Sequence, residues 1–348
     1  MKEARITPDV EVEIHEVPIP APKAGEVLVK VAVSGTNPKD WKMPVIYAYQ
    51  ATNSGDDFAG IVEAVGEGVF EFKPGDRVAA MHQIGTANGA FAEYAIAPAS
   101  TTFHIPDNTN FAEAATIPLT GLVAAFGLFH VLSLPAPWSP AGTKSTPLVI
   151  HGAGTAIGAF AIKLAKAANI GPIIATAGNS SDLVRGLLDV EQDDAIVDYR
   201  QPTEKLVADI QSAIAKIGKG PAWHGLDAIS NNDGAPEYVG ILKEVLGTQA
   251  GLDGKKPLVA TVQGGATVTG LVDGGYINVM LANIGTKEQQ CFGHTMSRLF
   301  TYGLAKGWLT GHPTEVVEGG LPGLGDALKR LKDGKVFGTK LVVEVGTQ

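Results

Sequence analysis

A glycine-rich segment near the middle of the chain has the composition and spacing of a turn that could hold a pyrophosphate group. An apolar run at 148–150 (LVI) is followed by residues 151–158 (HGAGTAIG), which lead directly into a helical pattern. Gly152 and Gly154 would allow a tight turn with backbone N–H groups close to a phosphate, and Gly158 would let the helix pack closely on the strand. The spacing is one residue longer than the usual fingerprint. Its place between a strand and a helix nevertheless favours dinucleotide binding over a merely tight turn.

The end of the next predicted strand indicates which dinucleotide would bind. Folds that select NAD carry Asp or Glu there, to hydrogen-bond the ribose hydroxyls of the adenosine. Residues 176–181 read TAGNSS, with no acid before Asp182. Small hydroxyl and amide side chains leave room for a 2′-phosphate. Arg185 and Arg200 are candidate counter-charges, although an exposed arginine commonly only faces solvent. The sequence therefore favours NADPH over NADH.

The elements around this turn alternate between strand and helix. Such alternation at βαβ spacing requires a parallel sheet with right-handed crossovers, and it predicts a doubly wound, nucleotide-binding sheet. The strands are expected at 147–151, 172–177, 195–198, 226–230 and 258–262, and the helices at 156–168, 182–188 and 204–217.

The residues before this region read as a β-rich domain. Short apolar strands are expected at 12–17, 26–33, 60–65, 77–81 and 91–97, separated by turns such as Lys73-Pro74-Gly75-Asp76. The last sixty residues contain a helix at 323–332 and a strand at 340–345, too little for a domain with its own core. We therefore expect residues 1–122 to form the first part of a catalytic domain, 123–286 the dinucleotide-binding domain, and 287–348 a return segment that completes the first.

Composition narrows the class of protein further. A hydrophobic fraction of 45%, a charged fraction of 18% and 43 glycines indicate a globular chain rich in turns. The net charge of −9 does not indicate the basic surface that nucleic-acid binding needs. The single cysteine, Cys291, excludes a disulfide framework. Residues 114–132 are apolar, but Pro118, Gly121 and His130 interrupt them, which favours a buried helix over a membrane span. With no secretory signal recognised, the expected location is the cytoplasm.

Several segments in order together resemble the medium-chain dehydrogenase/reductase superfamily, specifically its zinc-independent quinone oxidoreductases and fungal trans-acting enoyl reductases. These segments are 37–42 (NPKDWK), 55–62 (GDDFAGIV), 75–78 (GDRV), 89–94 (GAFAEY), 115–118 (ATIP) and 338–342 (GTKLV). The resemblance covers essentially the whole chain. It implies an α/β fold with a Rossmann sheet and a GroES-like β-rich catalytic domain that the C-terminus completes.

The resemblance also implies roles for individual residues. Asn37 and Thr120 match positions near the nicotinamide, and Tyr199 follows the third strand of the Rossmann domain. Other matched positions would surround the phosphates of the cofactor: Gly152, Ala153, Gly154, Thr155, Ala156 and Ile157 at the pyrophosphate, and Gly178, Asn179 and Ser180 at the adenosine phosphate.

The residues that bind zinc in the zinc-dependent relatives are missing. Those relatives place a Cys near Asn37 and a Gly-His-Glu where this chain has Gly55-Asp56-Asp57, and Cys291 lies far from both places. Catalytic zinc needs three protein ligands in a fixed frame. Asp56, Asp57 and His82 could form an oxygen-rich site, but a loop carboxylate pair more often orders a turn. We therefore expect no metal.

Without a metal, the easiest acceptor of a hydride from NADPH is an electrophile that is already activated. Candidates are a quinone and an alkene conjugated to a carbonyl or a thioester, whose reduction needs a hydrogen-bond donor for the enolate oxygen. The candidate catalytic residues are Asn37, Lys42, Tyr49 and His82, with Tyr47 nearby. A carbonyl or alcohol dehydrogenase and a non-catalytic NADPH-binding sensor or structural protein are the alternatives.

The expected partner is a small electrophilic substrate, and the chain is expected to be a monomer or a homodimer. Residues Gly274–Gly285 (GGYINVMLANIG) contain an apolar, strand-like segment late in the Rossmann domain. An edge strand there would expose unpaired N–H and C=O groups, which a second copy of the chain could cover. A local loop or helix could cover them equally well and leave a monomer.

Overall fold

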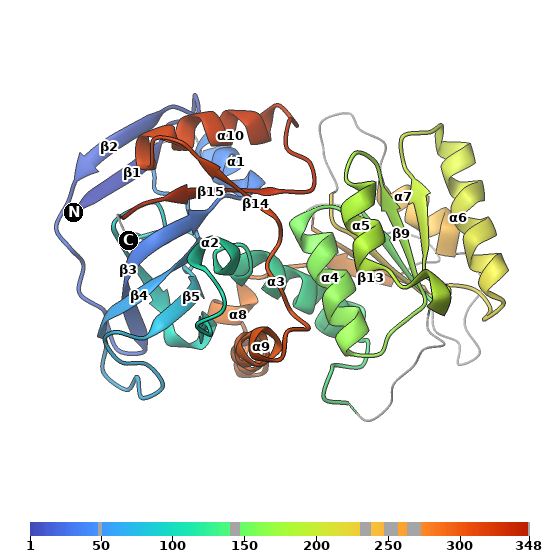
Figure 1. Ribbon diagram of the computed structural model, residues 1–348, viewed down its shortest axis with the longest axis horizontal. Coiled ribbons are helices and arrows are strands. Elements are labelled where there is room, and N and C mark those ends of the chain that lie inside the picture. The colour runs from blue at the N-terminus through green and yellow to red at the C-terminus, as the bar shows by residue number, and fades with distance from the viewer. Residues whose placement is uncertain (48–50, 140–146, 230–237, 247–256, 263–272, 347–348) are drawn as a thin grey trace. The chain divides into compact units, whose positions relative to one another are not determined.

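The computed structural model describes residues 1–47, 51–139, 147–229, 238–246, 257–262 and 273–346 (Figure 1). Tyr49, one of the catalytic candidates, lies outside the described residues. The contacts within the chain divide it into two compact units, Met1–Leu122 with Met280–Gln348, and Val123–Val279. We call these the first and the second unit.

The second unit is built on a six-stranded parallel sheet. Its strands run in the order β10-β9-β8-β11-β12-β13, so the first strand in sequence lies in the middle and the chain winds outward on both sides. This order defines a doubly wound sheet, whose ligands bind outside the carboxyl ends of the strands where the order reverses, here between β8 and β11. The strands are β8 (Leu148–His151), β9 (Ile173–Ala177), β10 (Ala195–Asp198), β11 (His224–Asp227), β12 (Leu258–Thr261) and β13 (Asp273–Tyr276).

Helices pack in two groups against this sheet, because its strands are apolar on both faces. Helix α4 contacts α5, and α6 contacts α7. The apolar side of α6 buries Leu206, Ile210 and Ile214 in one cluster with Val149 and Ile174 of the sheet. The helices are α4 (Ala156–Ala167), α5 (Ser181–Leu187), α6 (Thr203–Ile217) and α7 (Tyr238–Leu246), with a 3-10 turn at η3 (Val190–Gln192) and a π-helix at η2 (Phe126–Val131).

The first unit is β-rich, as its short punctuated strands predict. Seven strands form one sheet in the order β14-β15-β3-β4-β5-β7, with β6 also paired to β3, and β1 pairs with β2. The C-terminal strand β15 pairs with both β3 and β14, so the end of the chain completes this sheet. The strands are β1 (Lys2–Ile6), β2 (Val12–Glu16), β3 (Glu26–Gly35), β4 (Asp57–Val65), β5 (Arg77–Met81), β6 (Tyr94–Pro98), β7 (Thr102–His104), β14 (Thr314–Val317) and β15 (Lys340–Glu344).

Helices cover parts of the first unit. The longest, α9, begins with a capping box between Thr286 and Gln289 and ends at Gly307 in the left-handed region. The helices are α1 (Pro38–Tyr47), α2 (Phe111–Ala114), α8 (Leu281–Ile284), α9 (Lys287–Lys306) and α10 (Leu324–Lys332), with 3-10 turns at η1 (Ala99–Thr101) and η4 (Leu321–Gly323). Helix α3 (Pro118–Ala125) begins in the first unit and ends in the second.

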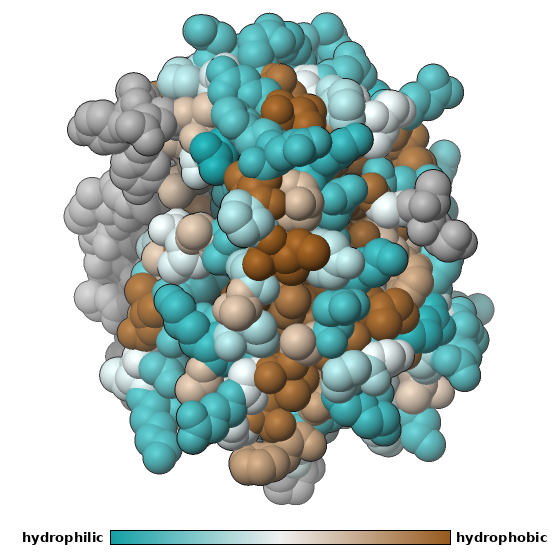
Figure 2. Space-filling view, turned by 90° about the vertical axis from the view of Figure 1, so that its left-hand side faces the viewer, coloured by the Kyte–Doolittle hydropathy of each residue, from teal (hydrophilic) through white to brown (hydrophobic). Residues whose placement is uncertain are grey.

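The apolar stretch that resembled a membrane span is a core segment. Among the described residues, Phe111–Val131 is the one stretch long and apolar enough to cross a membrane, and 83% of its most apolar window is buried inside the structure. On the face shown in Figure 2, apolar side chains form a broken column between hydrophilic ones rather than a continuous belt. These observations do not indicate a membrane protein.

The predicted fold class is confirmed, but one predicted strand is wrong over most of its length. Within Gly274–Gly285 only the first residues belong to a strand, because β13 ends at Tyr276 and helix α8 begins at Leu281. A short apolar run is compatible with either a strand or a helix, and periodicity alone does not separate them. The edge position is as expected, since β13 pairs with β12 alone among the described residues.

Candidate functional site

The turn after β8 brings backbone, rather than side chains, to the surface of the site. Gly152 has a φ of +75°, in the left-handed region that strains other residues. A Cβ on Gly158 would lie 2.6 Å from the Cα of Ala153 and would overlap the carbonyl oxygen of Gly152. Only glycine therefore lets the first turn of α4 pack this closely against the end of β8.

Thr155 caps the helix that begins at this turn. Its hydroxyl accepts a hydrogen bond from the N–H of Gly158 (3.0 Å) and donates one to the carbonyl oxygen of Gly152 (2.9 Å). Helix α4 runs for twelve residues beyond the cap, so its dipole favours an anion beside the first turn. The turn and the capped helix together are suited to an anion such as a pyrophosphate.

The buried side chain of His151 stabilises the glycine-rich turn through Thr176. The hydroxyl of Thr176, on β9, accepts from the N–H of Gly152 (3.2 Å) and lies 2.8 Å from Nδ1 of His151. His151 is 2% exposed, and this burial lowers its pKa to about 3. A neutral ring with an unprotonated Nδ1 fits this arrangement, because Thr176 can then donate its own hydrogen to that nitrogen.

The loop after β9 packs directly against the glycine-rich turn. A Cβ on Gly154 would overlap the hydroxyl of Ser180, and a Cβ on Gly178 would lie 2.7 Å from the ring of Tyr199. The structure therefore brings together the residues that the sequence assigns to the pyrophosphate and to the adenosine phosphate. All of them lie within the second unit.

Arg200 links the loop after β9 to the end of β10. Its Nη1 donates to Oδ1 of Asn179 (2.6 Å), while Nε and Nη2 donate to the carboxylate of Asp198 (2.6 to 3.2 Å). The hydrogen bonds from Arg200 lower the pKa of Asp198 to about 2. The other arginine considered from the sequence, Arg185, lies exposed on α5. Arg200 is therefore the cation held beside Asn179, although Asp198 partly neutralises it.

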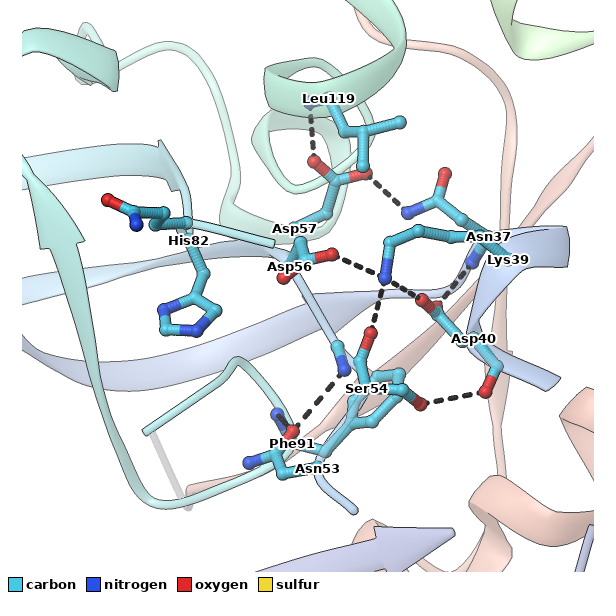
Figure 3. A network of polar contacts seen from close by, with 12 residues as sticks. Asn37, Lys39, Asp40, Asn53, Ser54, Asp56, Asp57, His82, Phe91 and Leu119 are labelled. Carbon is cyan, nitrogen blue, oxygen red and sulfur yellow. Dashed lines mark hydrogen bonds and ion pairs between the residues drawn. The ribbon is translucent and has the colours of Figure 1, made fainter. Parts of the chain in front are cut away.

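The first unit contains a buried network of charged side chains at the start of α1 and β4 (Figure 3). Asp57, fully buried, accepts from the side-chain amide of Asn37 (2.9 Å) and from the N–H of Leu119 (2.6 Å). Lys340 of β15 donates to Asp57 (2.5 Å) and to the side-chain oxygen of Asn37 (3.1 Å). Both ends of the Asn37 amide are therefore held by the chain itself.

Lys39 joins the start of α1 to residues 54–56 in the same network. Its ammonium group lies 2.7 Å from Oδ1 of Asp40 and 2.5 Å from the carbonyl oxygen of Ser54, and it also pairs with the carboxylate of Asp56. Burial raises the pKa of Asp40 to about 7 and also raises the pKa of Asp56, although Lys39 opposes both shifts. Burial disfavours the charge of Lys39, but the two carboxylates outweigh it and raise the pKa of Lys39.

His82 lies near this network, and its ring is held by hydrogen bonds. It is 2% exposed, with Nδ1 at 2.7 Å from the carbonyl oxygen of Ile96 and Nε2 at 3.0 Å from the hydroxyl of Thr86. Because a carbonyl oxygen only accepts, Nδ1 carries a hydrogen and donates it. The ring is thus engaged on both sides.

Of the remaining candidates, Thr120 borders this network, because the carbonyl oxygen of Thr116 that it contacts also accepts from Lys340 (3.4 Å). Thr120, on α3, is 4% exposed and donates to the carbonyl oxygen of Thr116 (2.6 Å). Lys42, on α1, places its ammonium group 5.5 Å from the centre of the Trp41 ring.

Lys39, Asp40 and Lys340 were not singled out as site residues from the sequence. Lys39 and Asp40 stand inside the NPKDWK segment and Lys340 inside GTKLV, so the local motifs were visible. The partners were not, because Lys340 and Asp57 are 283 residues apart in sequence. Charged residues are mostly exposed, and only the folded chain shows that Asp40 and Lys340 are buried and Lys39 partly buried.

The described residues contain no group of three or more His, Cys, Asp or Glu side chains arranged to hold a metal ion. The carboxylates of Asp56 and Asp57 are instead neutralised by Lys39 and Lys340. The two residues at the place of the Gly-His-Glu zinc motif therefore do not fit a zinc ion as they stand.

A doubly wound sheet with a glycine-rich turn after its central strand has the architecture of a dinucleotide-binding fold, and here it occurs in one chain with a β-rich unit. Comparison with known proteins agrees. The family model described as "Alcohol dehydrogenase GroES-like domain" matches residues 23–107. A trans-enoyl reductase of Gibberella fujikuroi is 37% identical over 321 residues, which cover 92% of this chain and 91% of the relative.

Solved structures show the same fold at lower identity. The CurK enoyl reductase has a TM-score of 0.75 with 20% identity over 99% of both chains. A mycobacterial protein complexed with NADPH has a TM-score of 0.73 with 18% identity, over 99% of this chain and 100% of that one. The chain belongs to the medium-chain dehydrogenase/reductase superfamily, as its sequence motifs predicted, and is an oxidoreductase of that type.

Proposed function

We propose that the protein reduces an alkene conjugated to a carbonyl group or a thioester, with NADPH as hydride donor and without a metal ion. One observation carries this proposal. The glycine-rich turn follows a central strand of a doubly wound sheet, in a chain that is 37% identical to a trans-enoyl reductase. An enoyl thioester is the favoured acceptor. A quinone is the second candidate.

The second unit would hold the cofactor, which supplies the hydride when bound. The backbone N–H groups of the turn and of the first turn of α4 would bind the pyrophosphate, with Gly152, Gly154 and Thr155 keeping that surface clear. Asn179, Ser180 and Tyr199 would border the adenosine phosphate. Asn37 and Thr120 would lie near the nicotinamide, by resemblance to the family.

The proposed preference for NADPH is supported by the end of β9. No acidic side chain stands there to bind the ribose hydroxyls, and Arg200 already donates to Asn179. A 2′-phosphate would give this guanidinium a second anion besides Asp198. Charge-assisted hydrogen bonds of this kind are about twice as strong as neutral ones.

Reaction without a metal ion is supported by the pairing of Asp56 with Lys39 and of Asp57 with Lys340. A zinc ion would have to displace the ammonium groups of Lys340, which is buried, and of Lys39, which is partly buried, at the cost of leaving them unpaired. The acceptor must then be activated by its own conjugation, which favours an enoyl group or a quinone over an isolated ketone.

Hydride addition to the β-carbon of an enoyl group leaves an enolate, whose oxygen needs a hydrogen-bond donor and whose α-carbon needs a proton. Asn37, Lys42, Tyr49 and His82 remain the candidates for these roles. His82 is the weakest of them, because its ring is already engaged by Ile96 and Thr86. Asn37 is better suited to positioning than to proton transfer, since an amide does not release a proton near neutral pH.

The test is oxidation of NADPH by the purified protein with a panel of acceptors: a trans-2-enoyl thioester, an enal, a quinone and an unactivated ketone. We expect the highest kcat/KM with the enoyl thioester, and lower activity with NADH. The Gly154→Val variant is the matched control, since it should lose the reaction together with cofactor binding. Tight NADPH binding with no turnover of any acceptor would favour the sensor or structural alternative. Reduction of the ketone alone, dependent on zinc, would favour an alcohol dehydrogenase.

A further inference from the structure

The ammonium group of Lys39 has the surroundings of a bound cation. It contacts three oxygen atoms from three places in the chain: Oδ1 of Asp40, the carbonyl oxygen of Ser54, and a carboxylate oxygen of Asp56 (Figure 3). An ammonium group has three hydrogens, so this set can use all of them. Lys39 is thus positioned to bind its own chain rather than a substrate.

The oxygen atoms around Lys39 also suit a hard divalent cation. The carboxylates of Asp40 and Asp56 and the carbonyl of Ser54 are the ligand types that Ca²⁺ takes, at 2.3–2.6 Å. The distances from the ammonium nitrogen to Ser54 and Asp40 are 2.5 and 2.7 Å, so these oxygens already point at one centre. Because Ca²⁺ takes about six to eight oxygen ligands, a cation in place of the ammonium group would need water molecules besides these three oxygens.

Charge balance favours a cation at this position. The side chains of Asp40 and Asp56 are 0% and 3% exposed, so water cannot screen their repulsion. The other titratable groups nearby are the Lys340–Asp57 pair, which neutralises itself, and the imidazole of His82. Lys39 is therefore the principal positive charge for these two carboxylates.

Lys39 also acts on Asn37 through Asp40. The second oxygen of Asp40 accepts the backbone N–H of Asn37 (2.7 Å), and the hydroxyl of Ser54 donates to the carbonyl oxygen of Asp40 (2.7 Å). The start of α1 is therefore held against residues 54–56 around one ammonium group. Loss of that charge would disturb the segment that carries Asn37.

We propose that Lys39 is a built-in cation that positions Asn37, and that its removal converts Asp40, Asp56 and the Ser54 carbonyl into a site for a divalent cation. Lys39 is thus a positioning residue rather than a catalytic one. This inference does not depend on the identity of the substrate, and its principal test does not use enzyme activity.

The test is thermal unfolding of Lys39→Ala in EDTA and in millimolar Ca²⁺ or Mn²⁺, with Mn²⁺ binding measured directly by electron paramagnetic resonance. Leaving two buried carboxylates without a partner should lower Tm on the order of 10 °C in EDTA. We expect Ca²⁺ or Mn²⁺ to restore at least half of this loss, and Mn²⁺ to bind the variant at least tenfold more tightly than the wild type.

Two variants control the result. Lys39→Ala/Asp56→Asn removes one carboxylate and should lose the response to the cations, whereas Lys42→Ala removes a lysine from the same helix and should not create one. Recovery of Lys39→Ala in folded form only when Ca²⁺ or Mn²⁺ is present would also support the proposal. The proposal is overturned if Lys39→Ala is as stable as the wild type or stays unfolded with the cations. It is also overturned if acid restores Lys39→Ala but Ca²⁺ and Mn²⁺ do not, because a proton would then be what replaces the ammonium.

Discussion

Acid should destabilise the glycine-rich turn through His151. Burial holds the pKa of this histidine at about 3, against 6.5 for an ordinary histidine. Below pH 6.5 His151 therefore binds a proton in the unfolded chain but stays neutral in the folded chain. The stability that the neutral ring provides is complete above pH 6.5 and is lost progressively as the pH falls toward 3.

The size of this effect follows from the linkage relation. A pH of 5 is about 1.5 units below the pKa of the unfolded histidine. Each unit lowers the free energy of unfolding by about 1.4 kcal/mol, so the loss of stability is about 2 kcal/mol. At pH 4 the same relation gives about 3 kcal/mol. Protonation would also remove the acceptor for the Thr176 hydroxyl, which in turn orders the N–H of Gly152.

The measurement is urea unfolding of the wild type and of His151→Asn between pH 4 and 8. The amide oxygen of asparagine can accept from Thr176 without titrating. We expect the variant to be less stable at pH 8, and its disadvantage to shrink by about 2 kcal/mol by pH 5. Parallel pH profiles would refute the reasoning. Asp40→Asn is an internal control with the opposite pH dependence. Burial raises the pKa of Asp40 to about 7, so the stabilisation from its protonated form is present at low pH and is lost as the pH rises through about 7.

Four further outcomes are expected. Gly154→Val should abolish binding of NADPH and NADH in isothermal titration, because the side chain would collide with Ser180 as well as with a pyrophosphate. Arg200→Ala should weaken NADPH binding about tenfold and NADH binding little, while Asp198→Asn should strengthen NADPH binding; equal losses for both cofactors in Arg200→Ala would contradict the role proposed for the guanidinium. EDTA or phenanthroline should leave the wild-type rate unchanged, whereas a loss reversed specifically by zinc would show that a metal is used. If β13 pairs with a second copy of the chain, light scattering should give twice 36.1 kDa, and Tyr276→Pro, next to the Ile277 N–H that donates to β12, should halve that mass; a wild-type mass near 36.1 kDa would reject pairing.

The sequence predicts the second unit well because its signals are local. Residues 195–198 form β10 as predicted, and the helix predicted at 204–217 differs from α6 by one residue at its start. The tight approach of Gly158 to Gly152 is likewise a property of neighbouring residues. Buried parallel strands and amphipathic helices carry their periodicity with them, so no distant partner is needed to recognise them.

The first unit is harder to predict, because its contacts join distant segments. Strands β7 and β14 were not predicted, and the apolar run beyond Tyr276 proved to lead into helix α8. The charged network is the clearest case. Lys39 and Lys340 look like ordinary surface lysines in the sequence, and only the folded chain shows which carboxylates neutralise them.

The two parts of the candidate site therefore differ in how they tolerate change. In the second unit, glycine keeps the turn clear and backbone groups provide the binding surface, so damage comes mainly from adding atoms. In the first unit, the side chain of Asn37 is held by the ion pair of Lys340 with Asp57. The position of Asn37 is therefore disturbed mainly by substitutions that remove one of these charged groups. Breaking one buried pair costs about 3–5 kcal/mol, because the remaining charge is left without a partner, whereas replacing both partners can be almost neutral. Paired neutral substitutions such as Lys340→Met with Asp57→Asn should thus be tolerated better than either alone, which would separate the role of the charges in folding from their effect on the position of Asn37.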